Sequence, residues 1–331
     1  MKKNFIKNIV AVLCIMTCSQ FSRAQDYHLS QYDISPLYMN PALAGMYLGE
    51  KGDFRVLANY RSQWQKLQSK PYTTSSLAFD KPIGRFGVGG YLIDNLAGLS
   101  NYNTFGFMVG GAYRITSDNS KNHFLTTGLQ IGLLNKKYGA NDLLFSEQYN
   151  SNQGLDPNAP TGESFQKFSL MKFDVNMGIY YKYKNESKRF NPFAGFSINH
   201  LDRPNQSTTS AVFRLPMRFN LSGGTDINIS SMLNLQPCIL FMYQGGAHEL
   251  MLGMLEYYRI NPTYQLVSGL SYRVKDAIII QLGIKQGSST FRMSYDIITS
   301  PLKAYAGSRG AIEMGIIYTA GEQRTYGKSM E

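Results

Sequence analysis

The residue types that most often perform catalysis or bind metals are sparse in this chain and lack functional spacing. The four histidines are His28, His123, His200 and His248, with no HxxxH pair, and no CxxC motif occurs. The chain also lacks a G-x-S-x-G element and a phosphate-binding glycine loop. A Ser-His hydrolase stays open in principle, because triads are defined by geometry and not by sequence order. We expect no enzyme, no metal site and no cofactor.

Charged and polar side chains instead alternate with apolar ones in stretches of about ten residues. In one stretch, Phe173, Val175 and Met177 alternate with Asp174 and Asn176, which puts the two sets on opposite faces of a strand. If the apolar face meets lipid, the other face lines a lumen, where charges form ion pairs or an aqueous channel. A register slip of one residue would exchange these faces. The candidate lumen residues are Arg55, Arg61, Asp174, Lys182, Arg214, Arg218, Arg292 and Asp296.

The alternation predicts fourteen strands. They span residues 53–63, 72–81, 84–95, 101–116, 121–136, 168–184, 188–201, 213–228, 231–243, 247–260, 262–274, 276–287, 289–299 and 310–320. An even number of antiparallel strands places both chain ends on the periplasmic side of a bacterial outer-membrane barrel. Connections that follow even-numbered strands are short, whereas several others are long, as expected for periplasmic turns and extracellular loops.

Other all-β folds also have alternating strands, so a soluble sandwich, a propeller and a lipocalin-like barrel are alternatives. Many of the predicted strands reach ten to sixteen residues, whereas strands in soluble proteins average about five or six. Tyrosine and phenylalanine gather near strand ends, as in the aromatic girdles of membrane barrels, and no fixed repeat indicates propeller blades. We therefore expect a single all-β, antiparallel outer-membrane barrel over residues 53–320. Scattered basic residues argue against nucleic-acid binding.

Residues 1–24 have the features of a secretory signal peptide. Lys2, Lys3 and Lys7 precede an apolar stretch, and Ala24 precedes the expected cleavage site. The longest apolar run, residues 9–16, is far shorter than the roughly 18 residues of a transmembrane helix. Cleavage would remove four basic residues and no acid, which lowers the net charge from +11 to +7. It would leave Cys238 as the single cysteine, so no internal disulfide is expected.

Residues 25–52 do not follow the strand pattern. They are polar overall and interrupted by prolines, but they also contain tyrosine, leucine and methionine, so we expect them to plug or dock on the barrel from the periplasmic side and not to form a loose tail. The candidate partner-binding or plug residues are Ser30, Gln31, Tyr32, Asn40, Pro41 and Gly45. Residues 321–331 are expected to form a periplasmic tail.

Several short motifs are shared with one known family. They are Ser30-Gln31-Tyr32, Asn40-Pro41-Ala42-Leu43-Ala44-Gly45, Tyr60-Arg61-Ser62-Gln63-Trp64, Ser294-Tyr295-Asp296 and Arg309-Gly310-Ala311-Ile312-Glu313. In these residues the chain resembles the PorP/SprF family of type IX secretion system membrane proteins of the Bacteroidetes. The resemblance implies a non-enzymatic partner that binds the C-terminal secretion domain of a large cell-surface protein, such as a gliding adhesin. It also implies a role in export, surface anchoring and coupling to the gliding machinery, with contacts to other secretion components.

Two other functions stay open. The Asn-Pro-Ala element before a fourteen-stranded barrel also resembles FadL-type outer-membrane channels for small or hydrophobic solutes, which should contain a ligand-sized apolar pocket. The other alternative is a purely structural or adhesive barrel. The longest predicted outer loop, residues 137–167, is acidic and is a candidate for gripping a protein partner.

Overall fold

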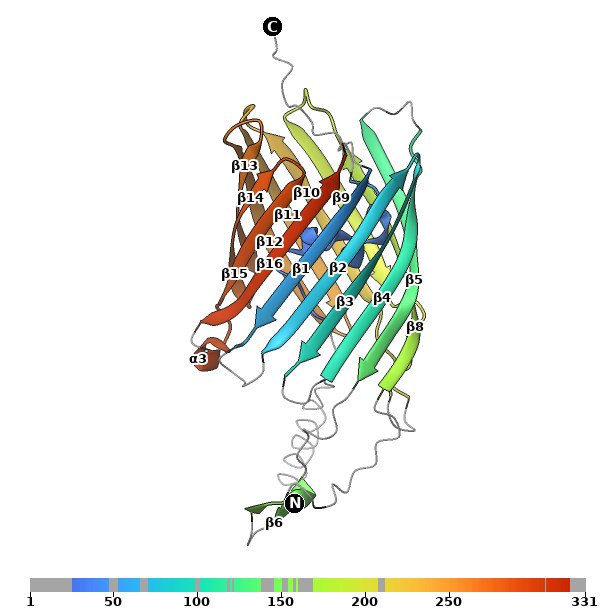
Figure 1. Ribbon diagram of the computed structural model, residues 1–331, viewed down its shortest axis with the longest axis vertical. Helices are drawn as coiled ribbons and strands as arrows, with labels where there is room; N and C mark the ends of the chain where they lie inside the picture. Colours follow the sequence, from blue (N-terminus) through green and yellow to red (C-terminus); the bar gives the residue numbers. More distant parts are fainter. Residues whose placement is uncertain are drawn as a thin grey trace, which may run out of the picture.

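The computed structural model describes residues 26–47, 53–65, 71–98, 102–117, 120, 122–137, 146–150, 154–156, 159, 169–207, 212–306 and 308–321. Fourteen antiparallel strands form one closed barrel, as Figure 1 shows. The strands are β1 (Phe54–Gln63), β2 (Tyr72–Ile83), β3 (Phe86–Ala97), β4 (Tyr102–Arg114), β5 (His123–Lys137), β8 (Ser169–Tyr183), β9 (Phe190–Asn199), β10 (Arg218–Asn228), β11 (Leu233–Gln244), β12 (Ala247–Arg259), β13 (Tyr264–Arg273), β14 (Ala277–Gln286), β15 (Ser289–Ile298) and β16 (Arg309–Ala320). The predicted fold is confirmed.

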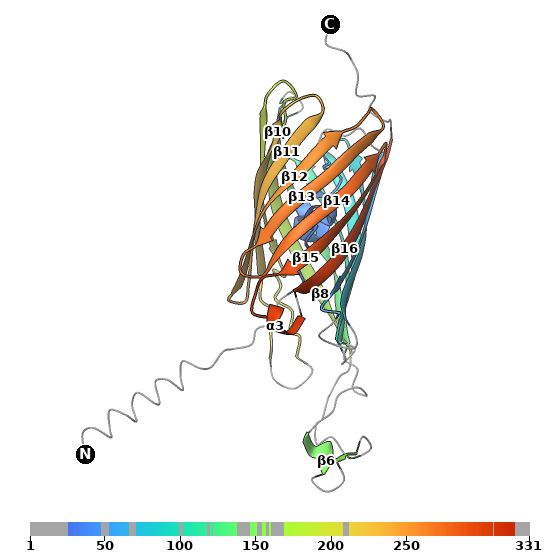
Figure 2. The same ribbon diagram turned by 90° about the vertical axis from the view of Figure 1, so that its left-hand side faces the viewer.

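Each strand pairs with its neighbours in the chain, and β1 pairs with β16 to close the barrel. We call the end where β1 begins and β16 ends the periplasmic end, because bacterial barrels have short periplasmic turns and longer outer loops. At the opposite, outer end lie α3 (Lys303–Ala306), η4 (Ser146–Gln148) and the two-residue strands β6 (Tyr149–Asn150) and β7 (Gly154–Leu155). Figure 2 shows α3 and β6 together at this end. No helix of the described residues is long and apolar enough to cross a membrane.

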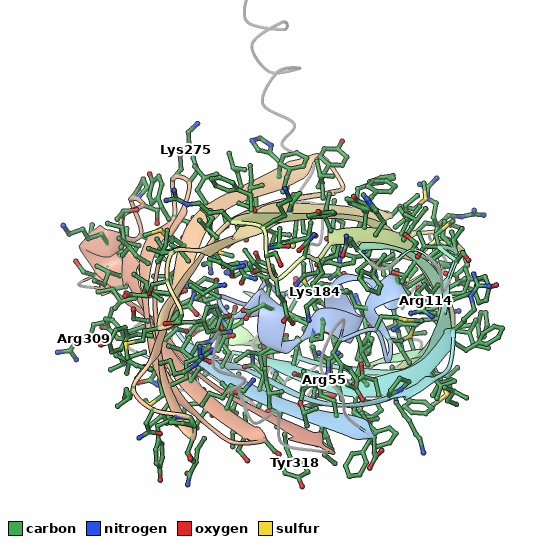
Figure 3. All side chains as sticks on the ribbon, turned by 90° about the horizontal axis from the view of Figure 1, so that it is seen from above. Arg55, Arg114, Lys184, Lys275, Arg309 and Tyr318 are labelled. Atoms are coloured by element: carbon green, nitrogen blue, oxygen red, sulfur yellow. The ribbon has the colours of Figure 1, made fainter. Side chains whose placement is uncertain are left out.

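The strand faces follow the predicted alternation. On β14, Ile278, Ile280 and Leu282 are exposed on the outside, whereas Ile279 and Gln281 are buried inside. Isoleucine and leucine on the outer face match the hydrocarbon around a membrane barrel, and a closed sheet leaves no backbone edge in lipid. In Figure 3, Arg55 and Lys184 lie toward the lumen, while Lys275 and Arg309 point away from the barrel.

One predicted strand begins later than expected. Residues 213–217 continue the alternation in the sequence, but β10 starts at Arg218. Pro216 has no backbone N–H to donate to a neighbouring strand, and the preceding residues instead bond within the β9–β10 connection, where the Leu215 N–H donates to the Pro204 carbonyl over 3.0 Å. Arg214 is therefore exposed in this connection and is not part of a barrel strand.

The N-terminal segment lies inside the barrel, where Figures 1 and 2 show it in blue between the walls. It contains η1 (Tyr32–Ile34), α2 (Pro36–Met39) and η2 (Pro41–Leu43). Both prolines stand at the first helical position, where the missing N–H costs nothing. We call residues 26–46 the plug. The plug supplies much of the buried hydrophobic core, which also includes inward-facing side chains of the strands.

Several expected regions lie outside the described residues. They are the signal peptide over residues 1–24, residues 48–52 of the N-terminal segment, most of the 137–167 loop, and residues 322–331 of the C-terminal tail.

Candidate functional site

The plug crosses the lumen from one end of the barrel to the other. At its start, the Asp26 N–H donates to the Gln244 side chain over 2.8 Å, at the outer end of β11. Near its other end, the Gly45 N–H donates to Asp80 over 2.8 Å, close to the periplasmic turn between β2 and β3. The chain therefore runs from the outer end toward the periplasm before it enters β1. The candidate site is this plugged lumen.

A buried group of charges on both sides of the barrel closure binds the start of the plug. Arg61 on β1 forms ion pairs with Asp296 on β15 over 2.9 Å and with Glu313 on β16 over 3.0 Å. The Glu313 carboxylate accepts the backbone N–H groups of Ser30 and Gln31 over 2.8 and 2.9 Å. Charge-assisted bonds of this kind are short and strong. They connect two predicted plug residues to two predicted lumen residues and one motif residue.

Two more arginines extend this group. Arg273 on β13 donates to the Ser30 hydroxyl over 2.7 Å and lies 3.3 Å from Asp296. Arg292 on β15 donates to the Gln31 side chain over 2.9 Å and forms an ion pair with Asp33 over 2.6 Å. Each guanidinium therefore bonds both a plug residue and a carboxylate. Breaking one pair would leave a buried charge without compensation.

The Asn-Pro-Ala element packs against glycines on the opposite wall. Asn40 accepts the Ala42 N–H over 2.9 Å and donates to the Ile179 carbonyl over 3.0 Å. A Cβ at Gly178 would lie 2.0 Å from the Asn40 amide oxygen, and a Cβ at Gly128 would lie 2.4 Å from the Pro41 carbonyl oxygen. These glycines therefore let the plug backbone approach the wall, which side chains would prevent.

The neighbouring polar side chains bond the plug backbone directly. Ser197 donates to the Met39 carbonyl over 2.6 Å, and Thr126 donates to the Ala42 carbonyl over 2.9 Å. At the end of the plug, Gly45 has a φ of 62° and no room for a side chain beside the Lys81 carbonyl. These bonds satisfy backbone groups that a short irregular segment would otherwise leave buried without partners.

A second cluster fixes the plug at the outer end. His200, just after β9, lies between Asp26 and Asp174 with nitrogen-to-oxygen distances of 2.7 and 2.9 Å. Arg218 pairs with Asp26 over 3.0 Å and lies over the Tyr38 ring, 4.2 Å from its centre. Burial alone would lower the pKa of His200, but the two carboxylates outweigh it and raise the pKa to about 9.

The Asp26 carboxylate responds to the same neighbours in the opposite sense. Burial favours its neutral form, but the charges of His200 and Arg218 outweigh burial and hold its pKa well below the usual value. Both groups are therefore charged at neutral pH.

The remaining predicted residues divide into two sets. Arg55 pairs with Asp80 over 2.7 Å, and Lys182 pairs with Asp226 over 2.9 Å, both in the lumen. Gln63 accepts a bond from Arg61 over 3.0 Å. The Tyr32 side chain lies beside Cys238.

The other motif residues do not join the plug contacts. Tyr295 and Arg309 are exposed outside the lumen. Trp64 is half-buried at the outer end of β1, with its ring centre 4.9 Å from that of Tyr72. The backbone N–H of Trp64 donates to the Gly310 carbonyl over 2.9 Å.

Sequence reasoning missed several residues that hold the plug, among them the ionisable residues Asp26, Asp80, His200 and Arg273. Arg273 is the last residue of β13, and its position in the alternation with Ser271 could have indicated the lumen. His200 lies in the predicted strand over residues 188–201, where the alternation puts it on the face opposite Asn199. In the structure it follows β9 with a φ of 60°, so only the folded chain shows its two carboxylate partners.

Two small cavities lie in the described part of the lumen. One lies beside Asp26, Tyr91, Asp174 and His200 and has room for about one or two waters. The next lies near Trp64 and Arg273 and is smaller. Neither has the size of a pocket for a small-molecule ligand.

Solved structures show what this fold is similar to. The toluene transporter TbuX of Ralstonia pickettii aligns with a TM-score of 0.53 at 12% identity, over 86% of this chain and 93% of that chain. The monoaromatic hydrocarbon channel CymD aligns with a TM-score of 0.52 at 10% identity, over 88% and 94% of the two chains. At such identities the likeness concerns the fold alone. No curated protein matches the sequence.

The family comparison covers nearly the whole chain. Residues 21–318 match the model of the type IX secretion system membrane protein PorP/SprF. Together with the closed barrel and its apolar outer face, this match confirms the expected location in the outer membrane. The chain belongs to the PorP/SprF family of type IX secretion system membrane proteins.

Proposed function

We propose that this barrel is a non-enzymatic partner of type IX secretion that binds the C-terminal secretion domain of a large cell-surface protein. In this function it supports the export and surface anchoring of an adhesin and couples it to the gliding machinery. The observation that carries the proposal is the plug, which crosses the lumen and is hydrogen-bonded to the wall at both ends and in the middle. A barrel closed in this way is suited to holding a partner, and the family membership supports the secretion context.

The test is affinity purification of the tagged full-length barrel from detergent-solubilised outer membrane, with mass spectrometry of the bound proteins. We expect a large secreted protein to be recovered, and its C-terminal domain alone to bind the purified barrel. Recovery of the same protein with the domain deleted would contradict binding through that domain. A barrel that emerges alone from cells that export the adhesin normally would contradict the proposal as a whole.

The alternative function is a channel for small or hydrophobic solutes. It is favoured by the similarity to barrels described as a toluene transporter and a hydrocarbon channel. The water-sized cavities of the described lumen count against it. Uptake of toluene into liposomes that contain the barrel, above the rate of protein-free liposomes, would favour this alternative.

A further inference from the structure

One seam of the barrel wall is much shorter than the others. β8 pairs with β5 along its whole length, Ser169–Tyr183, but it pairs with β9 only over residues 177–182. This is the shortest pairing between neighbouring strands in the barrel. The outer half of β8 therefore extends beyond the part of β9 that pairs with it.

The backbone groups of this outer half point out of the sheet edge. The Val175 carbonyl accepts the Leu201 N–H over 3.0 Å, so the groups of Val175 point toward β9. In a strand, alternate residues direct their N–H and C=O groups to the same side, so those of Phe173 and Met171 point the same way. Among the described residues, no backbone group pairs with them on this side. Within the described part of the chain, β8 thus has an open edge at residues 171–173.

The connection after β9 turns away from this edge. His200 and Arg203 have φ angles of 60° and 48°, in the left-handed region that non-glycine residues rarely adopt. Beyond this turn, Gln206 and Leu215 are buried over the barrel mouth, and Gln206 accepts a hydrogen bond from Lys136 on the lumen side. The described connection therefore reaches across the barrel mouth to β5, and none of its backbone groups pairs with residues 171–173 of β8.

The plug holds the paired part of the same seam closed. The Asn40 amide donates to the Ile179 carbonyl on β8 over 3.0 Å and to the Phe196 carbonyl on β9 over 3.4 Å. One side chain thereby bonds both strands below the open edge. The open edge of β8 therefore exists while the paired part of the seam between β8 and β9 stays closed.

The chemistry of this edge fits an extended peptide. Lipid provides no hydrogen bonds to backbone groups, whereas an added strand bonds them in the geometry of a sheet. The side chains of Met171 and Phe173 are 62% and 52% exposed on the outer face, and a strand with apolar residues at every second position would pack beside them. We propose that the outer edge of β8 binds an extended segment of the exported protein by strand addition. This inference rests on the proposed function and deepens it by naming the docking strand.

A proline at position 171 tests the edge selectively. Because the Met171 N–H points away from β5, Met171→Pro removes this donor without removing a hydrogen bond of the barrel. Met171→Ala shortens the same side chain but keeps the N–H, so it is the matched control. We expect purified Met171→Pro barrel to bind the C-terminal domain about tenfold more weakly, and Met171→Ala to bind like wild type. Heat-dependent gel mobility verifies that each barrel is folded.

A photo-crosslinking side chain at position 171 gives a second test that does not depend on proline. The control is position 282, which is 60% exposed on β14 and paired on both sides. We expect crosslinks to the exported protein from position 171 and none from position 282. A crosslink from position 171 to residues 138–168 of the same chain would overturn the inference, because the edge would then be covered internally.

The binding assay distinguishes a failure of the proposed function from a failure of the docking edge alone. If wild type captures no exported protein, the proposed function fails and this inference fails with it. If wild type and Met171→Pro capture it equally well, only the docking edge is overturned.

Discussion

Arg61 on the first strand and Glu313 on the last strand are direct partners in the register that closes the barrel, and their side chains form an ion pair over 3.0 Å. The same carboxylate accepts two backbone N–H groups of the plug, from Ser30 and Gln31. Barrel closure and plug binding therefore share one buried charge. A change at this position should affect both.

We expect Glu313→Gln to destabilise the barrel and loosen the plug. The substitution keeps the side-chain size but leaves Arg61 with one carboxylate fewer in a buried site, which typically costs about 3 kcal/mol. Urea unfolding in detergent micelles measures the loss, and proteolysis of the plug reports its release. Arg309→Ala, an exposed change on the same strand, is the control and should cost less than about 0.5 kcal/mol. Equal stability of the two variants would contradict a structural role for Glu313.

Gly178→Ala should displace the Asn-Pro-Ala element, because its Cβ would lie 2.0 Å from the Asn40 amide oxygen. Asn40→Ala removes that oxygen, so we expect the double variant to be more stable than Gly178→Ala alone. Gly223→Ala is the control, since a Cβ there meets only ordinary contacts at 3.6 Å and beyond. The four unfolding free energies of this cycle measure the coupling. If the two substitutions change the unfolding free energy additively, the alanine at position 178 does not clash with Asn40.

Much of the architecture was predictable because alternation is a local property of the sequence. Asp174 and Asp296 were expected in the lumen, and both lie there. The apolar face of each strand faces outward, so the alternation alone decides which of its side chains point into the lumen. The start of β10 was wrong by five residues, since the alternation continues through Pro216 although a proline cannot donate to the ladder.

The contacts of the plug were not predictable in the same way. The Arg61–Glu313 pair joins residues at opposite ends of the chain, so it depends on the register of barrel closure. Asn40 and Gly178 meet only because the plug follows a particular path through the lumen. Gly128 and Gly178 lie in strands, and their lack of side chains makes room for the plug.

The outer cluster predicts a pH dependence. The pKa of His200 is raised from 6.5 to about 9, so its charged form stabilises the fold fully below pH 6.5, and this stabilisation is lost as the pH rises through about 9. Asp26 contributes in the opposite direction. Its pKa is lowered in the folded protein, so its charged form stabilises the fold at neutral pH, and this stabilisation is lost only in strong acid. Protection factors from hydrogen exchange, which are corrected for the intrinsic rise of the exchange rate with pH, should therefore fall for residues 26–38 between pH 7 and 10.

His200→Gln should remove this pH-dependent change in hydrogen exchange. His123→Gln, at the opposite end of the barrel, should leave the change as it is in the wild type. A change that persists in His200→Gln would assign the pH dependence to another group.

The position of the connections predicts which parts of the chain reach the cell surface. Tyr305 on α3 is 79% exposed at the outer end, whereas Ser187 is exposed in the periplasmic turn between β8 and β9. In a Cys238→Ser background, we expect a membrane-impermeant maleimide to label Tyr305→Cys in intact cells. Ser187→Cys should be labelled only after the outer membrane is permeabilised. Labelling of Ser187→Cys alone in intact cells would invert the barrel, and it would move both the start of the plug and the β8 edge to the periplasm, where neither could contact a protein at the cell surface.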